Sequence, residues 1–353
     1  MSEDTMMIDE IVARARTAQA RYEAMGSQAL FDKACQAVAW VLMQPERNRV
    51  LAEMAVEETG LGNADDKVRK NHNKTLGLMR DIKDITAFGH VGDDDENGLS
   101  IYYRPKGLIA AVVPSTNPLA TPVNNTINAL KTGNAIILAP SPKGVKPLLA
   151  LFEHIHPALA KLGLPEDIVQ MVPAPPSKPK TERLMQLADL VVVTGSQANV
   201  RAGYSSGTPA LGVGAGNVVS IVDETADIAD AAAKIAASKT FDNATSCSSE
   251  NAVIAIDAVY DELVAALAAE GGYCLDAAQT AHLESIHWHN GKLTTKLLAK
   301  DIDVVLAETG FAATAPENTS FLVAPQDEFG PDHPMTGEKM SRFLALHRAG
   351  DFD

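Results

Sequence analysis

The chain has 353 residues, with 45 acidic and 30 basic side chains and a formal net charge of -15. This charge repels phosphate backbones and anionic bilayers, which argues against nucleic-acid and membrane partners. The length predicts two domains, or one large domain, with a buried core. Three cysteines without framework spacing, and no apolar leader or membrane span, predict a reduced, cytoplasmic protein.

The first part of the chain, from Met7 to about Phe88, predicts helices, because apolar residues recur at spacings of three and four. We interpret the first helix as a domain helix docked on a sheet, since its periodicity continues into the next; a targeting helix is the alternative. The acidic string GHVGDDDEN predicts a solvated turn. Strands are expected next, at 99–103 and 108–113.

After Pro114, short apolar strands alternate with helical patterns, as in a parallel sheet covered by helices. We expect strands at 135–138, 168–172, 190–193 and 218–222, and helices at 118–130, 145–162, 181–187, 198–205 and 228–240. This predicts a doubly wound α/β domain. A smaller α/β unit follows, with strands at 252–256, 319–323 and 343–346. Its pattern stops before a natural domain end, so we expect C-terminal truncation.

Two residues are candidates for catalysis. Cys247 lies in FDNATSCSSEN, between a helical run and a strand, where a thiol among Ser, Thr and Asn is placed as a nucleophile. The alternative is a packing thiol. Asn117, in VVPSTNP at a strand end, could donate to an oxyanion; the alternative is a pre-proline turn residue.

A dinucleotide site is predicted in VVVTGSQANV, where a strand runs into a helix start. Gly195 permits close backbone approach and Ser196 can cap the helix; an ordinary βα turn is the alternative. The string GVGAGN precedes a strand, so it predicts no phosphate loop. The pair His287 and His289 lacks a third ligand, so we predict no metal site and expect packing around Trp288.

Read in order, AGYSSGTPALGVGAGN and FDNATSCSSEN resemble the coenzyme A-acylating branch of the aldehyde dehydrogenase superfamily, and the resemblance covers nearly the whole chain. It implies an NAD(P)-binding domain over 1–240, with a β-hairpin near 99–113 for oligomerisation, and an incomplete catalytic domain over 241–353. It also implies a homodimer or homotetramer that takes a small aldehyde, NAD or NADP, and coenzyme A as co-substrate.

The resemblance implies roles for individual residues. Cys247 would form a thioester, Asn117 would complete the oxyanion hole, Gly195 and Ser196 would lie near the pyrophosphate, and Glu338 would hold the nicotinamide ribose. Further candidate cofactor-binding residues are Pro114, Ser115, Ser141, Lys143 and Gly214.

Two departures from the hydrolytic members concern the reaction and the cofactor. We expect Ala210 in the place of their glutamate base; without a base the thioester would await a thiol such as coenzyme A. Ala139 replaces their ribose-binding lysine. Ser141, Lys143 and Lys146 could instead meet a 2'-phosphate, so NAD and NADP both stay open.

The hydroxyls around Cys247 suit a small aldehyde with an anionic or polar tail, and this neighbourhood is similar to that of sulfoacetaldehyde-acylating members. Packing or capping serines are the alternative. Two other functions stay open: a hydrolytic dehydrogenase that uses another base and releases a carboxylic acid, and an inactive fragment.

Overall fold

The computed structural model describes residues 3–352, and the chain forms two compact units. Unit 1 comprises Lys67–Gly214 and the helical lead-in up to Thr59; unit 2 comprises Gly60–Asp66 and the chain from Ala215 onward. The boundary expected at residue 240 falls inside unit 2. The reason is that β8 (Val218–Val222) pairs with β9 (Glu250–Ile256), so β8 and the helix after it pack with the second sheet.

Unit 1 is built on a five-stranded parallel sheet in the order β5-β4-β3-β6-β7. Its strands are β3 (Leu108–Val113), β4 (Ala135–Pro140), β5 (Val169–Met171), β6 (Leu190–Thr194) and β7 (Ala210–Val213). Every residue of β3 and β4 is buried, as expected where helices cover both faces of a parallel sheet. The strand order changes direction between β3 and β6, which confirms the doubly wound topology.

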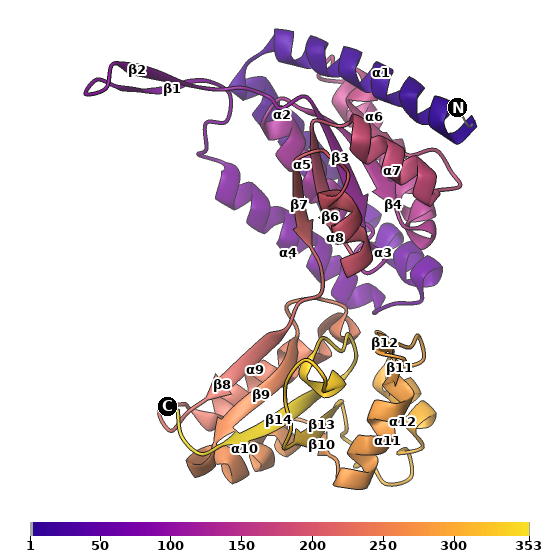
Figure 1. Cartoon of the computed structure of the whole chain (residues 1–353), viewed down its shortest axis with the longest axis vertical. Helices are drawn as coiled ribbons and strands as arrows, with labels where there is room; N and C mark the ends of the chain where they lie inside the picture. The colour runs from indigo at the N-terminus through magenta and orange to yellow at the C-terminus, as the bar shows by residue number, and fades with distance from the viewer. Residues whose placement is uncertain (1–2, 353) are drawn as a thin grey trace. The chain divides into compact units, whose positions relative to one another are not determined.

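Eight helices surround this sheet or lead into it (Figure 1). They are α1 (Glu3–Met25), α2 (Gln28–Met43), α3 (Pro45–Thr59), α4 (Ala64–Ile82), α5 (Ala120–Lys131), α6 (Val145–Ala160), α7 (Lys178–Leu187) and α8 (Gln197–Tyr204), with short turns η1 (Pro142–Gly144) and η2 (Glu166–Ile168). None of the helices in residues 3–352 is long and apolar enough to cross a membrane.

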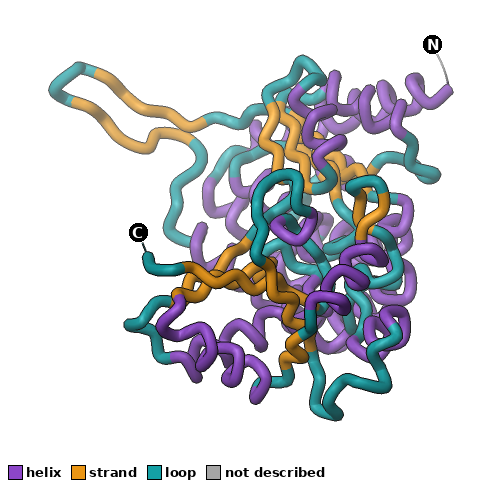
Figure 2. The backbone as a smooth tube through the Cα atoms, turned by 60° about the horizontal axis from the view of Figure 1, so that its bottom comes forward, coloured by secondary structure: helices purple, strands orange, loops and turns teal. Residues whose placement is uncertain are grey.

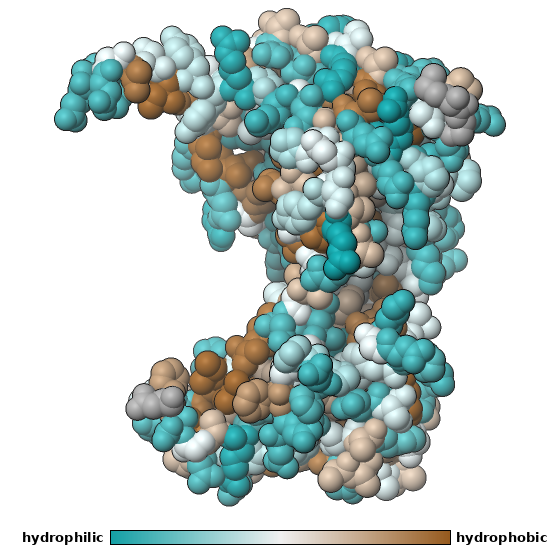
Figure 3. All heavy atoms as spheres, viewed as in Figure 1, coloured by the Kyte–Doolittle hydropathy of each residue, from teal (hydrophilic) through white to brown (hydrophobic). Residues whose placement is uncertain are grey.

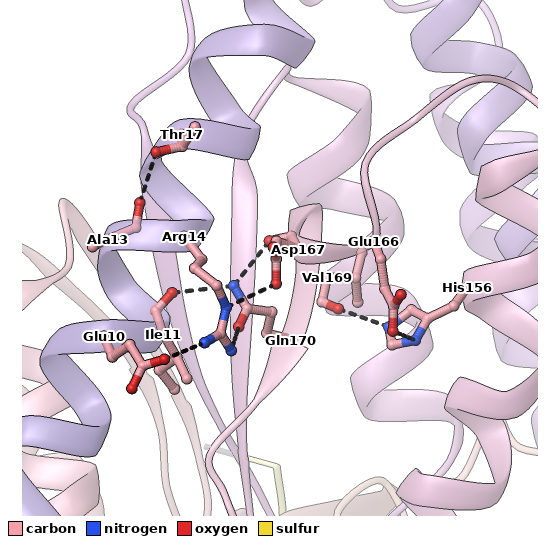
Figure 4. Close-up of polar contacts among 10 residues, drawn as sticks. All are labelled: Glu10, Ile11, Ala13, Arg14, Thr17, His156, Glu166, Asp167, Val169 and Gln170. Carbon is pink, nitrogen blue, oxygen red and sulfur yellow. Dashed lines mark hydrogen bonds and ion pairs between the residues drawn. The ribbon is translucent and has the colours of Figure 1, made fainter.

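The N-terminal helix α1 docks on the sheet, as expected. Its stripe of Ile8, Ile11, Val12 and Ala15 is buried in the core of unit 1. On the polar side of α1, Arg14 donates to Asp167 of η2 at 3.2 Å. Further polar contacts around this pair join α1 to β5 (Figure 4). The amphipathic pattern of α1 is therefore explained by packing within unit 1.

The hairpin of unit 1 differs from the expected one. It joins β1 (Gly89–Asp94) to β2 (Leu99–Tyr103) and extends away from the sheet (Figures 1 and 2). The hairpin predicted near 99–113 is thus wrong in one strand, because the wholly apolar β3 is buried between β4 and β6. The acidic string forms β1 and its turn. Leu99, Ile101 and Tyr102 of β2 stay exposed. Brown, hydrophobic surface is visible on the hairpin in Figure 3.

Unit 2 contains a second five-stranded parallel sheet, in the order β10-β13-β14-β9-β8. Its remaining strands are β10 (Gly272–Cys274), β13 (Phe321–Gln326) and β14 (Phe343–Ala349), with a short ladder of β11 (Trp288–His289) and β12 (Lys292–Leu293). Its helices are α9 (Ile228–Thr240), α10 (Asp257–Ala269), α11 (Ala277–His287) and α12 (Ile302–Thr309), with turns η3 (Phe241–Ala244) and η4 (Pro334–Thr336).

Candidate active site

In unit 1 the candidate residues gather at one edge of the sheet. Pro114, Ser115 and Asn117 follow β3, Ser141 follows β4, and Gly195 follows β6. Parallel neighbours end on the same side, so these segments lie together, at the edge and switch point where doubly wound sheets bind nucleotides. Asn117 is half-buried, and its side chain makes no hydrogen bond to another described residue, which leaves its amide available.

The turn after β6 has the geometry expected of a helix start. Ser196 is the N-cap of α8, and its hydroxyl accepts from the Asn199 amide at 3.3 Å. Gly195 donates to the Val213 carbonyl at 3.1 Å, which ties this turn to the end of β7. At Gly214 a Cβ would lie 2.7 Å from the side-chain oxygen of Gln197, so a larger residue there would require the flexible Gln197 side chain to move. The capping role of Ser196 is confirmed; phosphate binding stays a prediction.

The segment after β4 has one unused hydroxyl and two engaged lysines. The Oγ of Ser141 is buried without a hydrogen-bond partner. Lys143 donates to the Thr59 carbonyl at 3.2 Å, and Lys146 pairs with Glu58 at 2.5 Å. A buried hydroxyl without a partner costs stability unless a ligand or water satisfies it, so this strand end suits a sugar or phosphate oxygen.

In unit 2 the candidate residues gather at the amino-terminal edge of the sheet. Cys247 precedes β9, Gly216 precedes β8, and Glu338 precedes β14, and these three strands are neighbours. Cys247 is exposed in a turn closed by the Ser249 amide donating to the Ser246 carbonyl at 3.0 Å. No described group accepts a hydrogen bond from the Cys247 amide, so this N–H can meet a ligand oxygen beside its own thiol.

The three residues of η3 that lead into this turn have left-handed backbones: φ is 49° at Asp242, 53° at Asn243 and 57° at Ala244. Aspartate and asparagine tolerate this region better than most residues, yet each such conformation costs on the order of 1 kcal/mol. It persists only where the surroundings enforce it. The path of the chain into Cys247 is therefore determined by contacts of its neighbours.

Those contacts come from three distant segments of unit 2. Asp242 accepts from the Asn63 amide at 3.1 Å, and its own amide donates to Asp66 at 2.8 Å. The Asn243 amide group donates to Asp301 at 2.9 Å, and its oxygen accepts from Arg342 Nε at 2.9 Å. Both side chains are buried, so the approach to the thiol is rigidly held.

Gly216 and Glu338 lie beside the nucleophile. A Cβ on Gly216 would approach the Cys247 carbonyl oxygen to 2.9 Å and its Cβ to 3.4 Å, so glycine is required by close backbone approach. The Gly216 amide donates to Glu338 Oε1 at 3.3 Å. Burial raises the pKa of Glu338, while this hydrogen bond and the charge of Lys239 lower it. The structure thus brings Cys247, Gly216 and Glu338 together.

Lys239 is a buried cation behind this edge. It is the last lysine of α9, is fully buried, and donates to the Glu250 carbonyl at 2.8 Å. Burial lowers the pKa of Lys239 to about 7, although the charges of Glu250 and Glu338 oppose that shift. One Glu250 carboxylate oxygen is buried without a hydrogen-bond partner. The lysine therefore compensates two acidic groups next to the reactive turn.

A hollow of about 340 Å³ adjoins the same turn. Its lining residues are Lys234, Ala237, Ser238, Phe241, Ser246, Ser248 and Ser249. Two of them, Ser246 and Ser248, flank Cys247 in sequence, and their hydroxyl oxygens are 2.9 Å apart. The hollow is large enough for a small organic ligand, but Cys247 is not among its lining residues.

His287 and His289 behave as packing and surface residues, which confirms that interpretation. His287 is buried, its Nε2–H donates to the Lys339 carbonyl at 2.7 Å, and its ring packs edge-on against Trp288. Burial lowers its pKa to about 4. His289 is exposed. In the part of the chain that the structure describes, no group of three or more His, Cys, Asp or Glu side chains could hold a metal ion.

Comparison with known proteins matches residues 2–271 to the aldehyde dehydrogenase family. The chain is 52% identical to an acylating sulfoacetaldehyde dehydrogenase of Cupriavidus necator over 342 residues, which are 97% of this chain and 69% of that protein.

The chain belongs to the aldehyde dehydrogenase family.

Two solved structures refine this assignment. An acetylating aldehyde dehydrogenase from Geobacillus thermoglucosidasius is 33% identical, with a TM-score of 0.92 over 99% of this chain and 77% of that one. A propionaldehyde dehydrogenase from Rhodopseudomonas palustris, with bound CoA and an acylated cysteine, is 30% identical, with a TM-score of 0.85 over 98% and 77%. Within the aldehyde dehydrogenase family, the chain belongs to the coenzyme A-acylating branch.

The residue expected in place of the hydrolytic base, Ala210, begins β7 and pairs with Val191 of β6. Its position opposite the glutamate of hydrolytic members stays a prediction. A methyl side chain cannot activate water.

Three residues of the reactive edge were not identified from the sequence. Gly216 contacts Cys247 only through tertiary structure, although its place in GVGAGN was a signal. Lys239 has no signal of burial in the sequence, where it is one of two lysines of a predicted helix. Asn243 was visible next to the thiol in FDNATSC, but its left-handed backbone and its two partners were not predictable from spacing.

Proposed function

We propose that this protein oxidises a small aldehyde to its acyl-coenzyme A, with NAD(P)+ as the hydride acceptor. The observation that carries the proposal is an exposed thiol, Cys247, held on a rigid turn with its own amide free. In the proposed division of labour, unit 1 binds the dinucleotide and unit 2 supplies the nucleophile.

The reaction begins when the Cys247 thiolate adds to the aldehyde carbon, and the oxygen becomes an oxyanion that its own amide stabilises. Asn117 would be the second donor. NAD(P)+, held at the strand ends of unit 1 near Ser141 and Gly195, would supply the hydride acceptor, and the thiohemiacetal would then become a thioester on Cys247. The coenzyme A thiolate then attacks the thioester carbon, releasing acyl-coenzyme A and regenerating the cysteine. Atoms and electrons balance with one hydride transferred and one proton released.

Acyl transfer is favoured over hydrolysis because unit 1 presents no base where hydrolytic relatives carry a glutamate. Ala210, at the start of β7, is the residue we assign to that position. A thiolate nucleophile needs little help from a base, whereas water does. Coenzyme A therefore attacks the thioester faster than water does, although water is far more abundant.

We propose sulfoacetaldehyde as the substrate. The relative from Cupriavidus necator carries that activity in its name, and so does one from Bilophila wadsworthia that is 39% identical over 350 residues, 98% of this chain and 75% of that protein. The hydroxyls of Ser246 and Ser248 beside the thiol provide donors for an anionic tail.

For the cofactor we propose a preference for NAD+. The free Ser141 hydroxyl suits the nucleotide, but the nearby cation Lys146 is already paired with Glu58. A carboxylate near the ribose accepts from a 2'-hydroxyl and repels a 2'-phosphate. We also propose that the hairpin β1–β2 makes the oligomer contact; its exposed Leu99, Ile101 and Tyr102 support this. The cytoplasmic location stays a prediction.

The test is a spectrophotometric assay of NAD(P)+ reduction, with and without coenzyme A, across sulfoacetaldehyde, acetaldehyde, propanal and succinate semialdehyde. We expect coenzyme-dependent turnover that is fastest with sulfoacetaldehyde and is abolished in Cys247→Ala. Free acid without a coenzyme requirement would indicate a hydrolytic enzyme. Cofactor binding without turnover of any aldehyde would indicate an inactive fragment.

A further inference from the structure

The strand that leaves the turn of Cys247, β9, is fastened at its first two residues. The ammonium of Lys239 donates to the Glu250 carbonyl at 2.8 Å, which ties the strand to α9. The side-chain oxygen of Asn251 accepts from the Lys339 amide at 3.0 Å. This second contact spans 88 residues of sequence, so it joins the reactive turn to the loop before β14.

Lys339 determines the shape of that loop. It is fully buried, and its ammonium donates to the Met335 carbonyl at 2.5 Å and to the Gly337 carbonyl at 3.0 Å. Asn251 holds the amide of the same lysine, which belongs to the peptide unit that follows Glu338. The side chain of Glu338 therefore projects from a backbone that is held on both sides.

Asn251 occupies a position where packing alone would favour an apolar residue. It is 2% exposed and lies at the amino-terminal end of β9, between β8 and β14. A buried amide is costly unless it is hydrogen-bonded, whereas an apolar side chain would fill the same space at no such cost. The contact with the Lys339 amide accounts for the polar side chain.

The contacts of Asn251 belong to a closed circuit around the nucleophile. Beyond Lys339, the circuit continues through Glu338, whose Oε1 accepts from the Gly216 amide at 3.3 Å. It closes where Gly216 approaches Cys247, because a Cβ there would lie 2.9 Å from the Cys247 carbonyl oxygen. A closed circuit of short contacts fixes the relative positions of its members, as a preorganised site requires.

Resting on the proposed function, we infer that Asn251 is a positioning residue of the reaction. By holding the Lys339 amide it keeps Glu338 on the Gly216 amide, and it thereby keeps Gly216 packed against the turn of Cys247. Its action on the thiol passes through these residues. A small displacement of a nucleophile costs a large part of the rate, so the loss of this one acceptor should slow the chemical steps.

The test uses two variants of Asn251 and a matched control. Asn251→Ala removes the acceptor, whereas Asn251→Asp keeps an acceptor oxygen. The control is Thr309→Val in α12 of unit 2, because Thr309 is equally buried and its hydroxyl donates to the Val305 carbonyl at 2.8 Å. Asn251→Ala and Thr309→Val each remove one buried hydrogen bond, but only the former removes it from the circuit.

The first measurement is hydrogen exchange followed by mass spectrometry. In Asn251→Ala, we expect the amides of segments 214–218 and 335–341 to exchange about tenfold faster, because the circuit has lost one hydrogen bond. Asn251→Asp should bring exchange back to within about threefold of the wild type. Neither segment should change in Thr309→Val.

The second measurement is turnover of sulfoacetaldehyde at saturating coenzyme A and NAD+. Asn251→Ala should lower kcat about tenfold and change KM for the aldehyde less than about twofold, because binding is retained and orientation is lost. Combining it with Glu338→Gln should cost less than about twofold beyond Glu338→Gln alone, because both changes act on one contact.

Unchanged exchange in Asn251→Ala, or the same acceleration in Thr309→Val, would overturn the inference. Faster exchange with an unchanged kcat would also overturn it, because Asn251 would then serve stability alone, and so would losses that multiply in the double variant. If the wild-type chain shows no coenzyme-dependent turnover of any aldehyde, the proposed function fails, and with it the role of Asn251 in the reaction. Exchange that responds as expected would then show that the circuit exists without the activity.

Discussion

The buried lysine of α9 gives unit 2 a stability that depends on pH. Lys239 has a pKa of about 7 in the folded chain against an ordinary 10.5, because burial disfavours its charge. Below its folded pKa the lysine is protonated in both states, and the full cost of the buried charge is present. As pH rises from 7 towards 10.5, the folded state sheds the proton before the unfolded state does, so stability increases.

The size of this effect follows from the two pKa values. From the linkage between protonation and folding, the buried charge of Lys239 lowers the unfolding free energy by about 4 kcal/mol at pH 7 and by about 2 kcal/mol at pH 9, relative to a neutral Lys239. The wild-type unit should therefore gain about 2 kcal/mol of unfolding free energy over this interval from Lys239 alone. In Lys239→Met this gain should be absent. Lys234→Met, an exposed lysine on the same helix, should keep it.

The assay is urea denaturation followed by tryptophan fluorescence at the two pH values. Trp288 lies in unit 2 and Trp40 in unit 1, so Trp40→Phe gives a background in which fluorescence reports unit 2. The decisive quantity is the change in unfolding free energy between pH 7 and pH 9. The same pH dependence in the background and in its Lys239→Met variant would refute the reasoning.

Three further results are expected. Ala210→Glu should raise the ratio of free acid to acyl-coenzyme A about tenfold by placing a base where hydrolytic members carry theirs; an unchanged ratio would contradict our placement of Ala210. Asn243→Ala should lower the unfolding free energy of unit 2 by about 2 kcal/mol or more, measured by urea denaturation, because buried partners lose their hydrogen bonds; unchanged stability would mean that the turn holds itself. Glu58→Gln should raise kcat/KM with NADP+ about threefold by freeing Lys146, and no change would place the ribose elsewhere.

Much of the fold followed from local pattern. The buried runs of β3 and β4, and the helices between them, have the length and periodicity of a covered parallel sheet. The point at which the chain leaves the first sheet for the second could not be predicted from local pattern, because strand β8 has the same apolar character as the strands before it. Only its pairing with β9 assigns it to unit 2.

For the candidate site as well, residues with local roles were predictable and residues with tertiary roles were not. Cys247 and Ser196 were predictable because their roles depend on neighbours in sequence, a turn and a helix start. Gly216 and Lys239 were not, because their roles depend on what packs against them.

The turn before the thiol is held by residues 63, 66, 301 and 342. Because these residues lie far apart in the sequence, they are synthesised at different times. Until Arg342 has emerged, Asn243 lacks one of its partners, so the left-handed path has only part of its supporting contacts. A growing chain therefore carries Cys247 on an incompletely supported turn. It becomes a positioned nucleophile only when nearly all of the sequence present here has been synthesised and folded.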